Sequence, residues 1–210
     1  MQRQPVPDHR YAAATDEELV ERTLAGDPGA FDLIVARYKD RVFSYARRML
    51  NNPDTADEIA QDIFMRAYRY LDHFRGDSKF STWFYTIVSS TCKNAAKYHG
   101  LRSRSREEYS PGSDGELPSD PLDRVPSDVF APEPNVERIE TRRTVQDAIR
   151  ELPDIYRQVV VLKDINDFSY EEIARILECE LGTVKSRLAR AREMLRDKLT
   201  AAGIVGPECD

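Results

Sequence analysis

The spacing of apolar residues along this chain is that of amphipathic helices. From Phe31 to Met49, apolar positions recur every three or four residues, and shorter runs of the same kind follow to near the end of the sequence, as expected for helices that bury one side. No segment alternates apolar and polar residues as a half-buried strand would. The pattern therefore predicts an all-α fold.

Several helix starts are marked by residues that satisfy free backbone N–H groups. Capping boxes in Thr15–Glu18 and Ser169–Glu172 predict helices that begin just after the threonine or serine. Asp27–Pro28 combines an N-cap side chain with a proline in the first helical turn. Ser81 or Thr82 is expected to cap a further helix.

An acidic face is predicted on a helix that runs from about Asp54 to Leu71. Acids in a first helical turn favour the helix dipole, but Gln61 and Asp62 lie beyond that turn. For these two residues, periodicity leaves a solvated face and a partner-binding face equally open. The expected buried side is Ile59, Ala60, Ile63, Ala67 and Tyr70, and the expected exposed side is Asp54, Asp57, Glu58, Gln61 and Asp62.

Residues 169–199 have the pattern of a helix-turn-helix. A short capped helix is followed by Gly182, which is predicted to adopt a positive φ in the turn, and by Thr183, which is predicted to cap a second helix. The helical wheel of the second helix places Val184, Leu188, Ala191 and Leu195 toward the core, Ser186, Ala189, Arg190 and Glu193 outward, and Lys185, Arg187 and Arg192 on the flanks.

This arrangement of the second helix is suited to DNA. Long cationic side chains on the flanks of such a helix reach phosphates on either side of a major groove. The alternative is an amphipathic surface helix with a solvated charged face. The capped helix and glycine that precede it favour DNA binding, because they supply the structural context that the motif requires.

The charge of the chain is unevenly distributed. The net charge of −6 over 210 residues is unusual for a DNA-binding protein, because neutralisation of phosphates supplies much of the affinity. However, residues 78–106 contain no acid and include Lys79, Lys93, Lys97, Arg102, Arg104 and Arg106, whereas residues 107–137 contain nine acids and the single base Arg124. Two basic blocks are thus separated by an acidic one.

The acidic block divides the chain into two helical domains. Residues 107–134 hold half of the twelve prolines and have little apolar periodicity, which is typical of a linker. We expect a disordered tail at 1–14, a domain at 15–106, a flexible acidic linker at 107–135, a second domain at 136–202 and a tail at 203–210. The aromatic helix after the first basic stretch contains Trp83 and Ile87, for which core packing is favoured over stacking on unpaired bases.

Composition also bears on location and chemistry. No apolar run approaches the roughly 20 residues of a membrane span, and the N-terminus lacks the apolar core of a signal peptide. We therefore expect a cytoplasmic location and no membrane insertion. No catalytic constellation, metal site or cofactor motif is present, so neither a metal, a cofactor nor an enzyme is expected. The residues concerned are Cys92, Cys179 and Cys209, expected to be reduced and structural, and the scattered His9, His73 and His99.

Two long stretches resemble the extracytoplasmic-function sigma factors of bacterial RNA polymerase. Residues 54–94 contain the pattern D-E-x-x-Q-D-x-F, beginning at Asp57, and the sequence K-F-S-T-W, beginning at Lys79, and they are similar to sigma region 2. Residues 152–192 are similar to sigma region 4. Thr86 and Ile87 stand where housekeeping sigma factors carry a Trp pair, and the linker takes the place of region 3. Both departures are typical of the extracytoplasmic-function group.

The resemblance implies a role for each surface. Contacts with core polymerase are implied for Asp57, Glu58, Gln61 and Asp62, at the clamp helices of the β′ subunit. Contacts with the minus-10 element, including a flipped base, are implied for Gly76, Asp77, Ser78, Lys79, Phe80, Lys93 and Asn94. Contacts with the minus-35 element are implied for Thr183, Lys185, Ser186, Arg187, Ala189, Arg190 and Arg192.

The same resemblance implies partners and a biological setting. The chain would bind the β′ clamp helices and the β flap of core polymerase and promoter DNA, would assist DNA melting in a stress or envelope response, and would be restrained by an anti-sigma factor. It would lie at the nucleoid when bound to polymerase and near the membrane when held there by an anti-sigma factor. The free chain is expected to bind promoters poorly, because an acidic linker and separate domains leave neither basic block preorganised.

One alternative is an autonomous helix-turn-helix regulator that binds operators as a symmetric dimer. In that case residues 15–100 would serve as a sensor or dimerisation domain. The segment F-R-G-D-S-K-F-S-T-W, which begins at Phe74, would then have no explanation.

Overall fold

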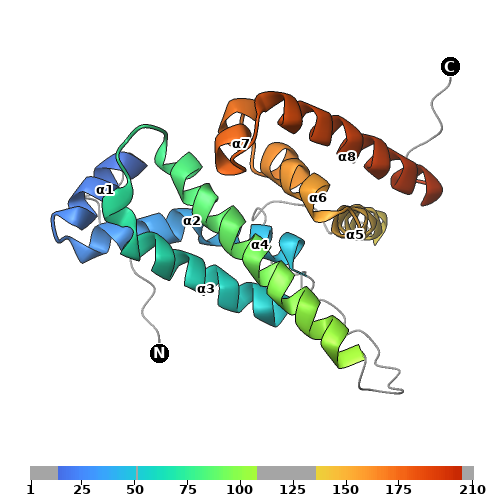
Figure 1. The fold of residues 1–210 in the computed structure, drawn as a ribbon, viewed down its shortest axis with the longest axis horizontal. Coiled ribbons are helices and arrows are strands. Elements are labelled where there is room, and N and C mark those ends of the chain that lie inside the picture. Colours follow the sequence, from blue (N-terminus) through green and yellow to red (C-terminus); the bar gives the residue numbers. More distant parts are fainter. Residues whose placement is uncertain (1–13, 51, 108–135, 205–210) are drawn as a thin grey trace.

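The computed structural model describes residues 14–50, 52–107 and 136–204, and within these ranges the regular structure is helical without strands. This confirms the predicted all-α class. Residues 108–135 of the expected linker and most of both expected tails lie outside the described residues, and Glu107 ends the helix before them. Figure 1 shows two groups of helices, one formed before the linker and one after it.

The N-terminal helical unit consists of α1 to α4. Its elements are α1 (Asp16–Leu24), α2 (Pro28–Met49), α3 (Pro53–Arg69), the 3₁₀ helix η2 (Leu71–His73) and the long α4 (Phe80–Glu107). The capping box of Thr15 and Glu18 is formed, and the Asp27 side chain accepts a hydrogen bond from the N–H of Gly29 at 3.1 Å. Both predicted starts are confirmed.

Helix α3 differs from the prediction at its ends. It begins at Pro53, where the Asn52 side chain accepts from the Thr55 N–H at 3.1 Å. Ala60, Ile63 and Ala67 are buried as predicted, and Ile59 is half-buried. The prediction that Tyr70 is buried is wrong: it is 47% exposed, because the helix ends at Arg69 and the chain turns into η2.

The start of α4 is capped by another helix. The predicted caps Ser81 and Thr82 lie inside the first turn, which begins at Phe80. The Phe80 N–H donates instead to Oε1 of Glu17 in α1 at 2.9 Å, so the sequence-based assignment of this cap is wrong. Trp83 and Ile87 pack, half-buried, against the apolar core, which confirms their core role.

The C-terminal helical unit consists of α5 to α8. Its elements are α5 (Val136–Arg150), α6 (Asp154–Val160), the π-helix η3 (Val161–Ile165), α7 (Tyr170–Ile176) and α8 (Leu181–Ala201). Helix α6 lies alongside α8, and α7 lies at the start of α8 (Figure 1).

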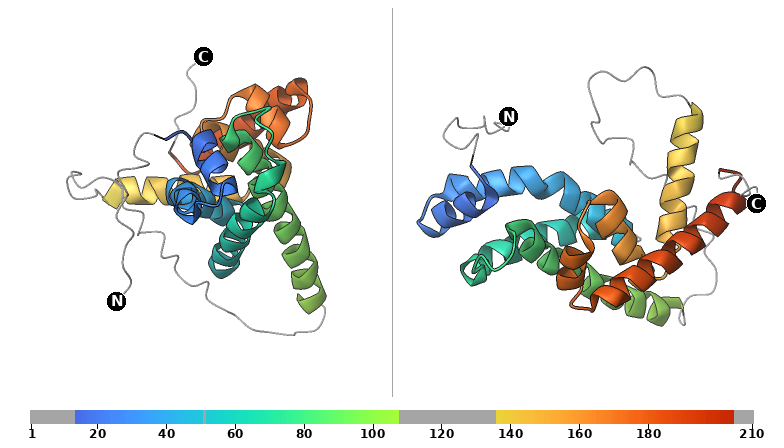
Figure 2. Two further views of the ribbon diagram at one scale, coloured as in Figure 1. Left: turned by 90° about the vertical axis from the view of Figure 1, so that its left-hand side faces the viewer. Right: turned by 90° about the horizontal axis from the view of Figure 1, so that it is seen from above.

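The two units pack against each other, a contact that the sequence pattern does not predict. The rings of Tyr85 in α4 and Phe168 before α7 are 4.7 Å apart, and one apolar core runs through both units. Nη1 of Arg157 donates to the carbonyl of Met49 at 3.3 Å, and Nδ2 of Asn166 donates to the hydroxyl of Tyr85 at 2.9 Å. Both views in Figure 2 show the C-terminal unit against α2 and α4. The two helical domains are therefore in contact with each other.

Candidate nucleic-acid interface

The turn between α7 and α8 has a different geometry from the one the sequence predicts. Helix α7 ends at Ile176, and Glu178 adopts a left-handed conformation with φ of 50°. The Cys179 N–H then bonds to the Ala174 carbonyl at 3.0 Å, and the Glu178 N–H bonds to the Arg175 carbonyl at 3.3 Å. These two bonds satisfy carbonyls at the end of α7 in the manner of a Schellman motif.

The start of α8 corrects two predictions. Helix α8 begins at Leu181, so Gly182 and Thr183 lie inside its first turn. Gly182 does not have the predicted positive φ, and Thr183 is not the N-cap; Glu180 occupies that position without a side-chain cap. The reason is local: Glu178 already supplies the left-handed residue that reverses the chain.

The faces of α8 agree with the helical wheel. Val184, Leu188 and Ala191 are buried and Leu195 is half-buried, while Arg187 and Thr183 are half-buried toward the edges. The outward surface comprises Lys185, Ser186, Ala189, Arg190, Arg192 and Glu193, all exposed. The capping box of Ser169 and Glu172 fixes the start of α7, and α7 in turn packs against α8.

Two arginines on this surface are already engaged. Arg190 forms an ion pair with Glu193 at 2.5 Å, and this hydrogen bond raises the pKa of Arg190. Arg192 forms one with Asp164 of η3 at 2.5 Å. Both pairs are solvent-exposed, and exposed ion pairs are weak because water screens the charges. Each arginine can therefore exchange its carboxylate partner for another anionic group.

In the N-terminal unit, the segment before α4 forms a tight bend. Gly76 has φ of 77°, which suits glycine, and Asp77 and Lys79 are exposed. The half-buried Ser78 donates to the Lys79 carbonyl at 3.3 Å. The Phe80 side chain points into the core, where its ring stacks on Phe84 at 5.7 Å. Its place in this segment is therefore structural.

Farther along α4, Lys93 and Asn94 are both exposed. They follow Cys92, whose thiol is fully buried, and burial raises its pKa to about 12. Cys92 is thus a small apolar residue of the core, which agrees with the predicted structural role.

On the acidic face of α3, two of the predicted residues form ion pairs and the other two are exposed to solvent. Asp57 binds the Arg47 guanidinium of α2 through contacts of 3.1 to 3.2 Å, and Asp62 binds Arg66 at 2.6 Å. Glu58 and Gln61 are exposed. Sequence reasoning missed Met65, which follows Gln61 by four residues on the same face and is 65% exposed. Its helical spacing from Gln61 was the available clue.

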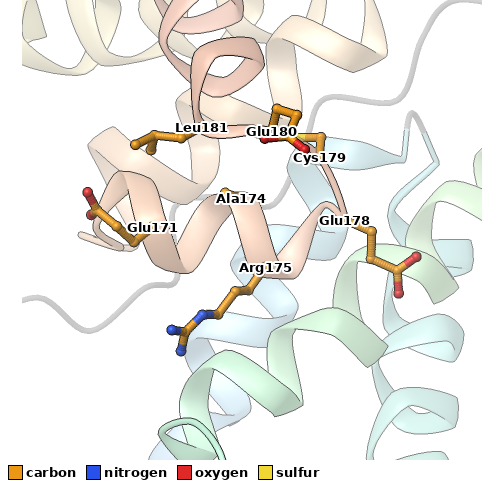
Figure 3. Close-up of a pocket in the computed structure, with 7 residues that line it drawn as sticks. All are labelled: Glu171, Ala174, Arg175, Glu178, Cys179, Glu180 and Leu181. Atoms are coloured by element: carbon orange, nitrogen blue, oxygen red, sulfur yellow. The ribbon is translucent and has the colours of Figure 1, made fainter.

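A shallow open hollow lies beside the helix-turn-helix turn (Figure 3). It is lined by Glu171, Ala174, Arg175, Glu178, Cys179, Glu180 and Leu181. The charged side chains in this view extend outward in different directions and do not converge on one point. Across the described part of the chain, no group of three or more His, Cys, Asp and Glu residues is arranged to hold a metal ion. In the same part, every helix is too short or too polar to cross a membrane.

Across the described residues, these features define an all-helical protein of two units with a helix-turn-helix in the second. A family model for sigma-70 region 2 matches residues 34–106, and one for sigma-70 region 4 matches residues 142–195. The RNA polymerase sigma-H factor of Pseudomonas aeruginosa is 37% identical over 180 residues, which are 86% of this chain and 91% of the relative. The ECF RNA polymerase sigma-E factor of Escherichia coli is 38% identical over 185 residues, covering 88% and 94%.

Solved structures share the fold. The sigma factor RpoE of Bartonella quintana, in complex with the anti-sigma factor NepR, aligns with a TM-score of 0.61 and 23% identity over 81% of this chain and 96% of that one. CnrH, in complex with the cytosolic domain of CnrY, aligns with a TM-score of 0.63 and 24% identity over 89% and 97%.

The chain belongs to the sigma-70 family, in the group of ECF RNA polymerase sigma factors. Such a protein is the promoter-specificity subunit of bacterial RNA polymerase and acts in transcription initiation.

Proposed function

We propose that the chain reads promoters through two surfaces that become effective once a third has bound core polymerase. Its two domains would be residues 15–106 and 136–202, and the matches to regions 2 and 4 lie inside them. The observation that carries the proposal is the face of α8, where Ser186, Ala189 and Arg190 point outward together from a buried apolar stripe.

The minus-35 element would be bound by this face of α8. Ser186, Ala189 and Arg190 are placed to contact base edges, while Lys185, Arg187 and Arg192 are placed for the phosphates on either side. Thr183 would lie at the edge of the contact, because it is half-buried in the first turn.

The minus-10 element would be bound at the start and middle of α4. Asp77, Ser78 and Lys79 follow the bend at Gly76, and Lys93 and Asn94 are exposed farther along. A base extruded from the strand costs a few kcal/mol, which contacts in a pocket or stacking offset. Phe80 would support this site from the core.

The face of α3 would bind the β′ clamp helices of polymerase, and the C-terminal unit would contact the β flap. Of the four residues proposed for this contact, Glu58 and Gln61 are exposed to solvent. Asp57 and Asp62 would act from within ion pairs to Arg47 and Arg66, so they would have to share or exchange their partners on binding.

Regulation by an anti-sigma factor is supported by one structural neighbour, the sigma factor RpoE of Bartonella quintana, which was solved in complex with the anti-sigma factor NepR. Because its partner is polymerase, the chain would work in the cytoplasm, at the nucleoid when it is part of the polymerase, and near the membrane if an anti-sigma factor holds it there. We place it in a stress or envelope response and assign it no catalytic step.

The test is in vitro transcription with core polymerase on a genomic library, with start sites read by sequencing. We expect start sites that share a minus-35 and a minus-10 element, and none of them with core polymerase alone. Absence of specific initiation would overturn the proposal. Tight, symmetric footprints by the free chain would favour an autonomous dimeric regulator instead.

A further inference from the structure

The segment proposed for the minus-10 element is anchored by an aromatic residue at each end. The ring of Phe74 packs edge-on against the ring of Phe80, with the centroids 5.7 Å apart. The Phe80 side chain is fully buried, and α4 begins at this residue. Between the two rings, Gly76, Asp77 and Lys79 are exposed to solvent. The exposed part of the segment therefore takes its position from the backbone at its two ends.

At the second end, the peptide group that joins Lys79 to Phe80 is hydrogen-bonded through both of its polar atoms. The Phe80 N–H donates to Oε1 of Glu17 in α1 at 2.9 Å, in a partly buried contact. The Lys79 carbonyl accepts from the N–H groups of Thr82 at 3.0 Å and Trp83 at 3.2 Å. A planar peptide group that is bonded on both sides has a fixed orientation. This orientation sets the direction in which the chain leaves α4 toward the exposed segment.

The bond from Glu17 is one that α4 does not supply for itself. The first N–H groups of a helix have no partner within the helix, and the first turn of α4 contains no acidic residue. A carboxylate at this end also interacts favourably with the helix dipole. Without Glu17, the Phe80 N–H would be left to water, and the Lys79–Phe80 peptide would be bonded on its carbonyl side alone.

Helix α1 is itself fixed to α2 by the residue that precedes Glu17. Asp16 accepts hydrogen bonds from Nη1 of Arg37 at 2.7 Å and from the hydroxyl of Tyr38 at 2.5 Å. Burial and the hydrogen bond to Asp16 raise the pKa of Tyr38, so its hydroxyl remains a donor. Leu19 of α1 is fully buried in the core. Glu17 therefore reaches the start of α4 from a rigid support.

We propose that Glu17 is a positioning residue for minus-10 recognition. Its carboxylate fixes the Lys79–Phe80 peptide and so holds residues 76–79 in the orientation in which they meet promoter DNA. The inference rests on the proposed function of residues 76–80. It adds α1, a helix without a predicted DNA contact, to the parts of the chain that determine promoter selection. Because the effect passes through the start of α4, it concerns the minus-10 element and leaves the minus-35 element unaffected.

Three substitutions at Glu17 separate the reach of its side chain from its charge. Glu17→Ala removes the acceptor, and Glu17→Asp keeps the charge but withdraws the carboxylate from the Phe80 N–H by one methylene. Glu17→Gln keeps an acceptor oxygen at the same reach and removes the charge. Glu18→Ala is the matched control, because the Glu18 carboxylate accepts from the Thr15 N–H at 2.9 Å at the start of α1 itself. The control thus loses a bond of the same kind at a different helix end.

Discrimination at the minus-10 element is the first readout. In vitro transcription with core polymerase would compare a promoter found in the genomic library with templates changed at one minus-10 base or one minus-35 base. Glu17→Ala and Glu17→Asp should lower the minus-10 discrimination ratio about tenfold, which corresponds to about 1.4 kcal/mol, and leave the minus-35 ratio unchanged. Glu17→Gln should retain the minus-10 ratio, and Glu18→Ala should retain both. A loss of folded protein would lower activity on all templates together and would leave the ratios as they are.

The amide signal of Phe80 is the second readout. In the free full-length chain with isotope-labelled phenylalanine amides, this signal should move upfield in Glu17→Ala and stay in place in Glu18→Ala. The inference is overturned if the signal does not move in Glu17→Ala, if neither ratio falls, or if the minus-10 and minus-35 ratios fall together. Specific initiation by the wild-type chain without any minus-10 preference would overturn the proposed function of residues 76–80, and the inference with it.

Discussion

The geometry of the turn in the helix-turn-helix predicts that Glu178→Gly and Gly182→Ala both stabilise the protein. Glu178 has φ of 50°, and left-handed backbone costs a non-glycine residue about 1–2 kcal/mol. Glycine removes that cost but loses more backbone entropy on folding, about 0.5–1 kcal/mol. Glu178 is exposed, so no packing is lost. Glu178→Gly should therefore raise the free energy of unfolding by about 0.5–1 kcal/mol.

Gly182 should respond in the opposite way to its sequence-based expectation. It lies in the first turn of α8 without a positive φ, and nothing lies within 4 Å of where a Cβ would be. Gly182→Ala should thus stabilise the protein by up to about 1 kcal/mol, the helix propensity difference between the two residues. If Gly182 were the left-handed residue of the turn, the same change would destabilise it.

Thermal denaturation by circular dichroism measures both effects. For a chain of this size, 1 kcal/mol moves the melting temperature by about 2–4 °C, and each variant should move it upward. Glu193→Gly in the middle of α8 is the matched control and should lower it, because glycine in a helix interior costs about 1 kcal/mol. A lower melting temperature for both Glu178→Gly and Gly182→Ala would refute the turn geometry, whereas unchanged minus-35 activity would show that α8 keeps its place.

Four further predictions concern the surfaces and buried groups. Arg190→Ala should weaken initiation by about 1–3 kcal/mol at promoters that depend on a minus-35 element; equal loss on every promoter sequence would make Arg190 a phosphate contact. Glu58→Arg should lower the affinity for core polymerase in a pull-down titration, whereas Glu21→Arg, an exposed change on α1, should not. Cys92 should resist maleimide at pH 8 in the folded protein, because burial raises its pKa to about 12; mass spectrometry would show a modified Cys92 if that environment were wrong. Burial by itself would raise the pKa of Glu172, but hydrogen bonds from Ser169 and Lys79 lower this pKa overall. The stability that Glu172 contributes is therefore present above its unfolded pKa of about 4.3 and is lost as the pH falls through the lower folded pKa. Glu172→Gln should make the free energy of unfolding less dependent on pH in this acidic range, and an unchanged pH dependence would contradict the assignment.

Sequence determined the features of this protein that depend on neighbours within one helical turn. The caps at Thr15, Asp27 and Ser169 join residues two or three positions apart, so the local pattern contains all of the required information. The faces of α8 follow in the same way, since helical periodicity alone separates Val184 and Leu188 from the outward residues.

Tertiary structure decided the features that join distant segments. Glu17 caps α4 across 63 residues, and this contact replaced the cap expected from Ser81 or Thr82. The closure of one unit on the other through Tyr85, Phe168 and Asn166 could not be read from either stretch alone, because each reads as a complete helical domain until the surfaces that meet are known.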